Sequence, residues 1–341
     1  MVVVTATQSE QVPATTESSD AAPPWLRRIF VANLVAQVGI VVTGGLVRVT
    51  GSGLGCPTWP ECVDGSLTPT TEQAESWHKY VEFGNRLLTF VLAALAIAAF
   101  IGVLRWTAQR RGAGLPARRP IVLLAAVPLL GTVVQAVLGG ITVLTGLHPA
   151  TVAIHFLVSA AIIAAVTVLV QRARENGDQP QTVTVAPQLR AMAWALVGLA
   201  AVILVIGTIV TGSGPHAGDP GEVERFGFDQ RLVAWLHADV VLLFVGVQIG
   251  MLLGISLTGA PATVRNRAFQ LLGVTLANGL VGYSQLATGL PWLLVSIHML
   301  LACLLWVAAI RLLLATRVRG TVSDVDVTGG HRAVASAPRS A

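Results

Sequence analysis

Eight long apolar stretches constrain the fold of this chain more than any other feature of its sequence. A helix that crosses a bilayer needs roughly 20 consecutive apolar residues, and each stretch is of about that length. The stretches cover about residues 29–49, 80–104, 120–145, 150–171, 190–211, 231–257, 267–288 and 291–315. We therefore expect an all-α integral membrane protein with eight transmembrane helices.

The composition excludes several other classes of protein. Of the 341 residues, 54% are hydrophobic and only 11% are charged, whereas a soluble globular domain has about 25% charged residues. An ordinary soluble enzyme and a disordered chain are therefore excluded. The formal net charge is +5, but the basic residues lie between apolar stretches, so we expect membrane lipid and no nucleic acid as a partner.

The basic residues are distributed unequally between the two sets of loops. Of the 22 Lys and Arg residues, 17 fall at the chain ends and in the connections after the second, fourth and sixth stretches. The others are Arg48, Lys79, Arg86, Arg225 and Arg231. Because cytoplasmic loops carry the excess of Lys and Arg, we expect a plasma-membrane protein with both termini in the cytoplasm. The loops 50–78 and 212–230 then face outward.

The chain divides into two halves that resemble each other. Residues 145–155 and 288–298 share Thr-Gly-Leu and a His at the same spacing, and residues 50–53 repeat the Thr-Gly-Ser-Gly of 211–214. Each half contains four apolar stretches, so both halves start on the same side of the membrane. Chance similarity of apolar segments is the alternative. We expect two pseudo-symmetric four-helix bundles related by a parallel repeat.

The expected organisation follows from these boundaries. Residues 1–28 form a polar, disordered cytoplasmic tail, and 29–172 form the N-terminal four-helix half. A cytoplasmic linker at 173–189 leads to the C-terminal half at 190–316, and 317–341 form a second cytoplasmic tail.

Three histidines lie inside the expected helices. His155, His237 and His298 each lie five to seven residues from the outer end of a stretch, about 10 Å deep. A pair of His at equal depth in a four-helix bundle can ligate a haem iron from both faces. A hydrogen-bonded packing role is the alternative for a single His, and zinc would need three or four converging ligands. Ionisable residues at this depth are costly and usually functional.

The N-terminal half has a different set of polar residues at this depth. Aligning the second and sixth stretches places Asn85 where the other half has His237. His78, Glu82 and Asn85 share one helix face. Glu82 and Arg86 are four residues apart, so a structural ion pair is one interpretation. A carboxylate at a reaction centre is the other.

Two cysteines lie close together on the first outward loop. Cys56 and Cys62 are six residues apart, and a nearby pair outside the cytoplasm can oxidise. The spacing favours a disulfide over two separate free thiols. A zinc site would need four ligands, and this loop offers too few.

These motifs together resemble the heme A synthase family, membrane enzymes that make haem A for cytochrome c oxidase. The matching segments span both halves and are residues 44–57, 82–86, 148–155, 211–219, 236–239 and 297–298. The resemblance implies a reaction that oxidises the C8 methyl group of haem O to a formyl group. It also implies haem O as substrate, an electron acceptor that the sequence does not identify, and heme O synthase and oxidase assembly factors as partners.

The resemblance implies a role for each deep polar residue. His237 and His298 would hold a haem b cofactor, and His155 would be an axial ligand of haem O in the N-terminal half. Glu82 matches the catalytic Glu of the family. Many members have His where this chain has Asn85, and an amide is a poor iron ligand. The Cys pair matches the outer-loop pair of part of the family.

Further residues complete the expected substrate site. Asn85, Arg86 and His78 would line the pocket, and Arg48, Arg225 and Arg231 are candidate anchors for the anionic propionates, since Arg binds carboxylates bidentately. Snorkelling Arg side chains are the alternative. A di-haem b-type electron-transfer protein and a transporter with parallel repeats are the rival functions. The first would need His pairs in both halves, and the second would not need three His at one depth.

Overall fold

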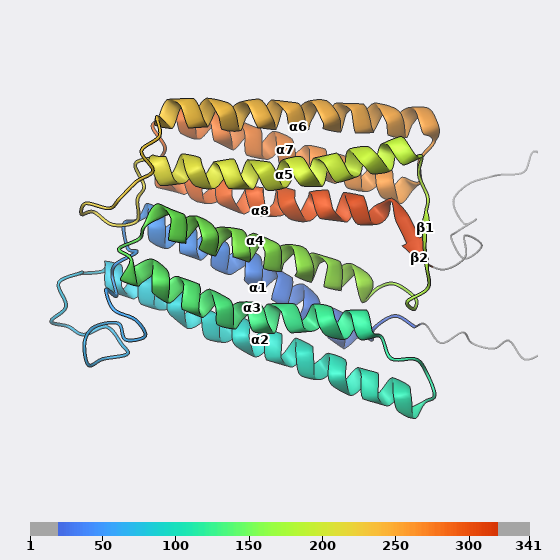
Figure 1. Cartoon of the computed structure of the whole chain (residues 1–341), viewed down its shortest axis with the longest axis horizontal. Helices are drawn as coiled ribbons and strands as arrows, with labels where there is room; N and C mark the ends of the chain where they lie inside the picture. The colour runs from blue at the N-terminus through green and yellow to red at the C-terminus, as the bar shows by residue number, and fades with distance from the viewer. Residues whose placement is uncertain (1–19, 320–341) are drawn as a thin grey trace, which may run out of the picture.

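The computed structural model describes residues 20–319, and this range contains eight long helices (Figure 1). The helices are α1 (Pro24–Val49), α2 (His78–Gly112), α3 (Arg119–Leu144), α4 (Pro149–Arg172), α5 (Pro187–Ser213), α6 (Gln230–Thr258), α7 (Ala262–Ala287) and α8 (Trp292–Ala315). The fold is mostly helical, as the apolar stretches predicted. It also has an antiparallel pair of short strands, β1 (Gln181–Val183) and β2 (Arg317–Arg319), which sequence reasoning missed.

Seven of the helices between residues 20 and 319 are long and apolar enough to cross a membrane. The exception is α7, although its length is sufficient. Its first turns carry Arg265 and Arg267, and Asn278 and Gln285 follow near its other end. These polar side chains lower the mean hydropathy of the helix, so the expectation of eight apolar spans is confirmed for seven.

The helices pack in two groups. Within the first, α1 contacts α2, α2 contacts α3, α3 contacts α4, and α4 returns to α1; α5 to α8 contact one another in the same order. Consequently α2 lies diagonally opposite α4, and α6 lies diagonally opposite α8. Figure 1 shows α1–α4 on one side of the molecule and α5–α8 on the other, with α1, α4, α5 and α8 at the boundary.

Each group has its own apolar core, and a third cluster joins them. Val38 and Val41 on α1 pack with Ile163 on α4 and with Cys303 and Val307 on α8. Met299 on α8 fills the space beside Gly45 on α1, because a Cβ on Gly45 would lie 1.9 Å from Cε of Met299 and the Met side chain would have to move.

Two turns repeat the same unusual backbone. Leu147 and Leu290 adopt left-handed conformations with φ of 60° and 61°, which are uncommon for a residue other than Gly. The N–H of Leu147 donates to the carbonyl of Thr142 at 2.9 Å, and that of Leu290 donates to Gln285 at 2.7 Å. Both bonds are the closing bonds of a helix C-terminus. The turns before α4 and before α8 are therefore built alike, and both fall on the repeated Thr-Gly-Leu.

The end of the molecule opposite the long loops holds a buried ionic network. Arg118 is 1% exposed and donates to the carbonyls of Asp20, Arg172, Glu175 and Gly177. Its guanidinium also pairs with Asp178 at 3.1 Å. Burial lowers the pKa of Arg118, and the Asp178 carboxylate opposes that shift.

The two ends of the described chain are tied to this network. Arg317 and Arg319, the two ends of β2, pair with Glu175 in the linker, and β2 pairs with β1 from the same linker. Helix α1 begins at Pro24, earlier than the expected residue 29, because Pro is favoured in the first helical turn, and Leu26 is fully buried. Of the tails expected at 1–28 and 317–341, residues 1–19 and 320–341 lie outside the described residues.

Candidate functional site

The C-terminal group places two histidines on diagonally opposed helices. His237 lies on α6 and His298 on α8, the two helices that the packing order places diagonally opposite each other. Each ring packs against a glycine of the preceding helix. A Cβ on Gly207 of α5 would lie 3.5 Å from Cε1 of His237, and one on Gly282 of α7 would lie 3.3 Å from Cε1 of His298.

The N-terminal group repeats this construction with one substitution. His155 lies on α4 and packs against Gly139 of α3, where a Cβ would lie 3.6 Å from its Cε1. Asn85 lies on the opposed helix α2 and packs against Gly44 of α1, where a Cβ would lie 3.8 Å from Nδ2. Each group therefore has two deep polar side chains held on opposed helices.

Within the described part of the chain, one nitrogen of each imidazole is left without a hydrogen bond, although His298 also has a hydrogen bond to the backbone of Asn278. The Nδ1 atoms of His155, His237 and His298 are buried and have no hydrogen-bond partner among residues 20–319. A buried polar atom without a partner costs free energy, so a packing role alone does not explain three such residues. Imidazole nitrogen is the usual axial ligand of haem iron, so three of the four positions have the donor chemistry for haem, and Asn85 does not.

Glu82 lies one turn from Asn85 and is almost fully buried. Its Oε1 accepts hydrogen bonds from Nη2 and Nε of Arg86 at 2.7 and 3.1 Å, so the ion pair predicted from their spacing is present. Its Oε2 accepts the backbone N–H of Cys56 at 2.7 Å. Arg86 also donates to the carbonyls of Cys56, Thr58 and Glu61 at 2.8, 3.1 and 3.0 Å. The pair therefore fixes the 56–61 loop to α2.

The loop that this pair holds is closed by a disulfide. Cys56 and Cys62 are bonded, as their spacing predicted, and both are fully buried. Between them, Trp59 packs on α3, because a Cβ on Gly140 would lie 2.4 Å from Cδ2 of the indole. Gly140 is adjacent to Gly139, which faces His155. The disulfide loop therefore covers the loop end of the N-terminal group, from α2 to α3.

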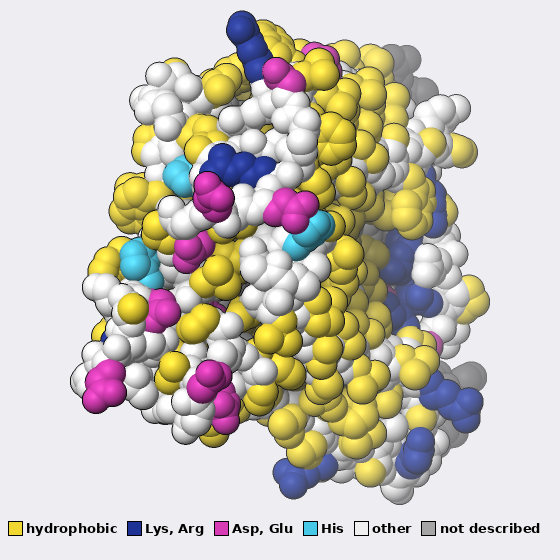
Figure 2. All heavy atoms as spheres, turned by 60° about the vertical axis from the view of Figure 1, so that its left-hand side comes forward, with side chains coloured by type: hydrophobic (Ala, Val, Ile, Leu, Met, Phe, Trp, Pro, Cys, Tyr) yellow, Lys and Arg dark blue, Asp and Glu magenta, His cyan; other side chains and the backbone are white. Residues whose placement is uncertain are grey.

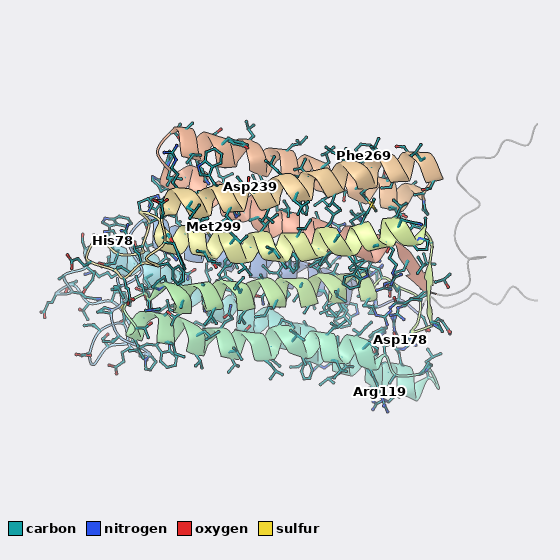
Figure 3. The ribbon with its side chains drawn as sticks, turned by 45° about the horizontal axis from the view of Figure 1, so that its top comes forward. His78, Arg119, Asp178, Asp239, Phe269 and Met299 are labelled. Carbon is teal, nitrogen blue, oxygen red and sulfur yellow. A yellow bond between two sulfur atoms is a disulfide. The ribbon has the colours of Figure 1, made fainter. Side chains whose placement is uncertain are left out.

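His78, predicted to line the pocket, is engaged elsewhere. Its Nδ1 lies 2.8 Å from the hydroxyl of Ser52, and its ring stacks on Trp77. Figure 3 places His78 at the loop end of the molecule, beyond Met299, the neighbour of His298. Its contacts tie the start of α2 to the end of α1.

The three arginines predicted as anion anchors have different surroundings. Arg48 joins the two groups, because its Nε donates to the carbonyl of His216 at 2.8 Å and its Nη2 to that of Thr211 at 3.1 Å. Arg225 lies near enough to Arg48 for their charges to interact, and both it and Arg231 are exposed. Figure 2 shows this loop face, where acidic, basic and His side chains gather beside the hydrophobic flank of the helices.

Sequence reasoning missed the residues that support the deep side chains. These are the glycines at 44, 139, 207 and 282, and Thr43, whose hydroxyl donates to Oδ1 of Asn85 at 2.7 Å. The sequence repeat could have identified two of these glycines. Gly139 and Gly282 each lie six residues before the repeated Thr-Gly-Leu.

Comparison with known proteins gives the family. The model of the COX15-CtaA family, described as cytochrome oxidase assembly protein, matches residues 27–218. The chain belongs to this family. The match covers more than half of the 341 residues and includes both members of the Asn85–His155 pair. With seven helices able to cross a membrane in the described range, this family member is a multi-pass membrane protein.

Curated relatives of this family member are called heme A synthases. The protein so named from Alkalihalophilus pseudofirmus is 30% identical over 167 residues, which cover 48% of this chain and 51% of the relative. The one from Lysinibacillus sphaericus is 33% identical over 146 residues, covering 42% and 44%. The chain thus spans about half the length of the curated relatives it matches.

Proposed function

We propose that this protein is a heme A synthase, an oxidoreductase that converts the C8 methyl group of haem O to a formyl group. Membership of a cytochrome oxidase assembly family supports the pathway, and the names of the relatives support the reaction. The observation that carries the proposal is the pair of deep sites built alike, with His237 and His298 in one and His155 in the other.

The two helix groups take different roles in this proposal. They are two pseudo-symmetric four-helix bundles of a parallel repeat, with α7 as the eighth span. His237 and His298 hold a haem b cofactor, whose iron supplies one-electron chemistry when it is bound. His155 is an axial ligand of the substrate haem O in the N-terminal bundle. The unpartnered Nδ1 atoms of all three support this assignment.

Glu82 is the proposed catalytic carboxylate. It lies on α2, as Asn85 does, and the disulfide loop covers it from the outside. Its Oε2 bond to Cys56 and its Oε1 bonds to Arg86 hold the carboxyl group in one position. From there it holds or moves a proton at the edge of the substrate site. Arg48 and Arg225 lie close together with like charge, which favours an anion such as a haem propionate beside them.

The location and partners follow from the same proposal. The protein lies in the plasma membrane with both termini in the cytoplasm, because the basic residues gather at that end. It receives haem O from heme O synthase and delivers haem A toward cytochrome c oxidase and its assembly factors. Its electron acceptor is a separate partner.

A co-expression experiment tests the function. Membranes of cells that lack their own haem A synthase but make haem O are analysed by chromatography of extracted haems, with and without this chain. We expect haem A only when the chain is present, and none with His155→Ala. Unchanged haem O, together with two b-type haems in the purified protein, would overturn the proposal and favour the di-haem electron-transfer protein.

A further inference from the structure

We propose that the substrate haem in the N-terminal bundle is ligated by the protein on one face only, by His155. The opposite face is left open to a small exogenous ligand, and the side-chain amide of Asn85 donates a hydrogen bond to that ligand. This inference rests on the proposed function, because it concerns the face of the haem that the same site presents.

The equivalence of four positions is the first step. His155, His237 and His298 each place Cε1 within 3.3–3.6 Å of where a glycine of the preceding helix would carry a Cβ. Asn85 stands in the same relation to Gly44, at 3.8 Å. The amide therefore occupies the place that an axial imidazole occupies at the other three positions.

The orientation of the amide is the second step. Oγ1 of Thr43 lies 2.7 Å from Oδ1 of Asn85 and 3.2 Å from the carbonyl oxygen of Ile40. Its single hydrogen is shared between these two acceptors, and the amide oxygen is the nearer one. The shorter contact favours the orientation in which the amide oxygen faces Thr43 and Nδ2 is the free end with both its hydrogens. Among residues 20–319, the structure gives Nδ2 no acceptor. A donor held in one orientation and left without an acceptor is suited to a bound ligand.

The chemistry of the amide is the third step. The nitrogen lone pair of an amide is delocalised into the carbonyl, so Asn85 does not ligate iron, yet its N–H groups are good donors. Hydrogen-bond donors and steric access on the distal side of a haem decide whether a small ligand binds. Asn is also shorter than His, which leaves room between its side chain and the iron.

The neighbouring Glu82 side chain does not occupy the open face of the substrate haem. Both carboxylate oxygens of Glu82 are used, one by the N–H of Cys56 and one by Arg86. In the other bundle, His237 and His298 occupy both positions, so a haem there has no open face. The two bundles therefore differ in one property that can be measured, which is access of a small ligand to the iron.

Ligand titration of the purified full-length protein, loaded with haem O, tests the inference. Carbon monoxide is added to the reduced protein and cyanide to the oxidised protein, and absorption spectra are recorded. We expect one haem that binds both probes and one low-spin haem that binds neither. Asn85→His should abolish binding of both probes and add a second low-spin haem.

Two further variants separate the effect of the Asn85 hydrogen-bond donor from the effect of the free space on that face of the haem. Asn85→Ala should keep the open face but weaken cyanide binding about tenfold, the loss expected for one hydrogen bond to a charged group. It should also raise the stretching frequency of bound carbon monoxide. Thr43→Val keeps the volume and removes the bond that orients the amide, and we expect a smaller change in the same direction.

Two results would overturn the inference. One is a wild-type protein whose two haems both refuse carbon monoxide and cyanide. The other is unchanged binding in Asn85→His with both haems present. These outcomes are separable from the proposed function. If haem A forms but neither probe binds, only the inference of an open haem face is overturned. If the probes bind but the co-expressing cells form no haem A, only the proposed reaction is overturned.

Discussion

Oε2 of Glu82 accepts the backbone N–H of Cys56 at 2.7 Å. This bond connects a buried carboxylate on α2 with the first residue of the disulfide loop. Because Arg86 holds the other carboxylate oxygen and three carbonyls of the same loop, the ion pair and the loop form one unit. A change in the position of the loop should therefore shift the Glu82 carboxyl group, and a substitution of Glu82 should displace the loop.

Substitution of Glu82 distinguishes a catalytic from a structural carboxylate. Glu82→Gln keeps an acceptor for Cys56 and Arg86 but cannot take up or release the proton. We expect it to keep haem b on His237 and His298, to form no haem A and to accumulate haem O or its alcohol. Chromatography of membrane haems measures this. Near-normal haem A would leave only the structural role.

Arg86→Gln is the matched control for the ion pair. It leaves the Glu82 carboxylate buried without its cation, and breaking a buried pair in this way costs about 3–5 kcal/mol. We therefore expect a lower unfolding temperature for Arg86→Gln than for Glu82→Gln. Unfolding temperatures of both variants equal to that of the wild type would show that the pair contributes little to holding the loop.

The two loop cysteines should resist alkylation. Closing a short loop by a disulfide contributes roughly 2–3 kcal/mol of constraint, and Cys56 and Cys62 are both buried. Mass spectrometry after alkylation without reductant should find both unmodified even in denatured protein. Cys303, a free buried thiol on α8, is the internal control and should be labelled on denaturation. Full labelling of all three would contradict the disulfide.

The C-terminal bundle should lose its haem when either ligand is removed. His237→Ala and His298→Ala each delete one imidazole of the opposed pair, so we expect loss of the low-spin haem b spectrum with normal membrane insertion. His148→Ala is the control, since that half-exposed side chain lies near Glu224 at the loop end. Wild-type haem content in both ligand variants would refute the assignment.

The buried network at the other end should contribute strongly to stability. Arg118→Met removes a guanidinium that bonds four backbone carbonyls and Asp178, and we expect a loss of about 3–5 kcal/mol, as for other broken buried pairs. Arg119→Met changes the adjacent, exposed residue and should have almost no effect. Thermal unfolding in detergent compares the two. Similar unfolding temperatures would show that Arg118 does not stabilise this end.

Local patterns were sufficient for much of this molecule. Apolar length predicted the helices, with α7 the exception in hydropathy, because the transfer of a helix into lipid depends on its own residues. The repeated Thr-Gly-Leu coincides with the paired turns at Leu147 and Leu290, since backbone conformation is set within a few residues. The Cys56–Cys62 disulfide followed from spacing for the same reason.

What the sequence by itself determined was the helical content, the repeated segments, the place of His155, His237 and His298 along their helices, and the Asn at position 85 where the aligned half has His. Only the tertiary structure decided what each side chain contacts. Thr43 and Asn85 lie on different helices, and Arg48 reaches loop carbonyls of the other half. Such contacts depend on how helices pack across the whole chain, and no periodicity within one helix encodes them.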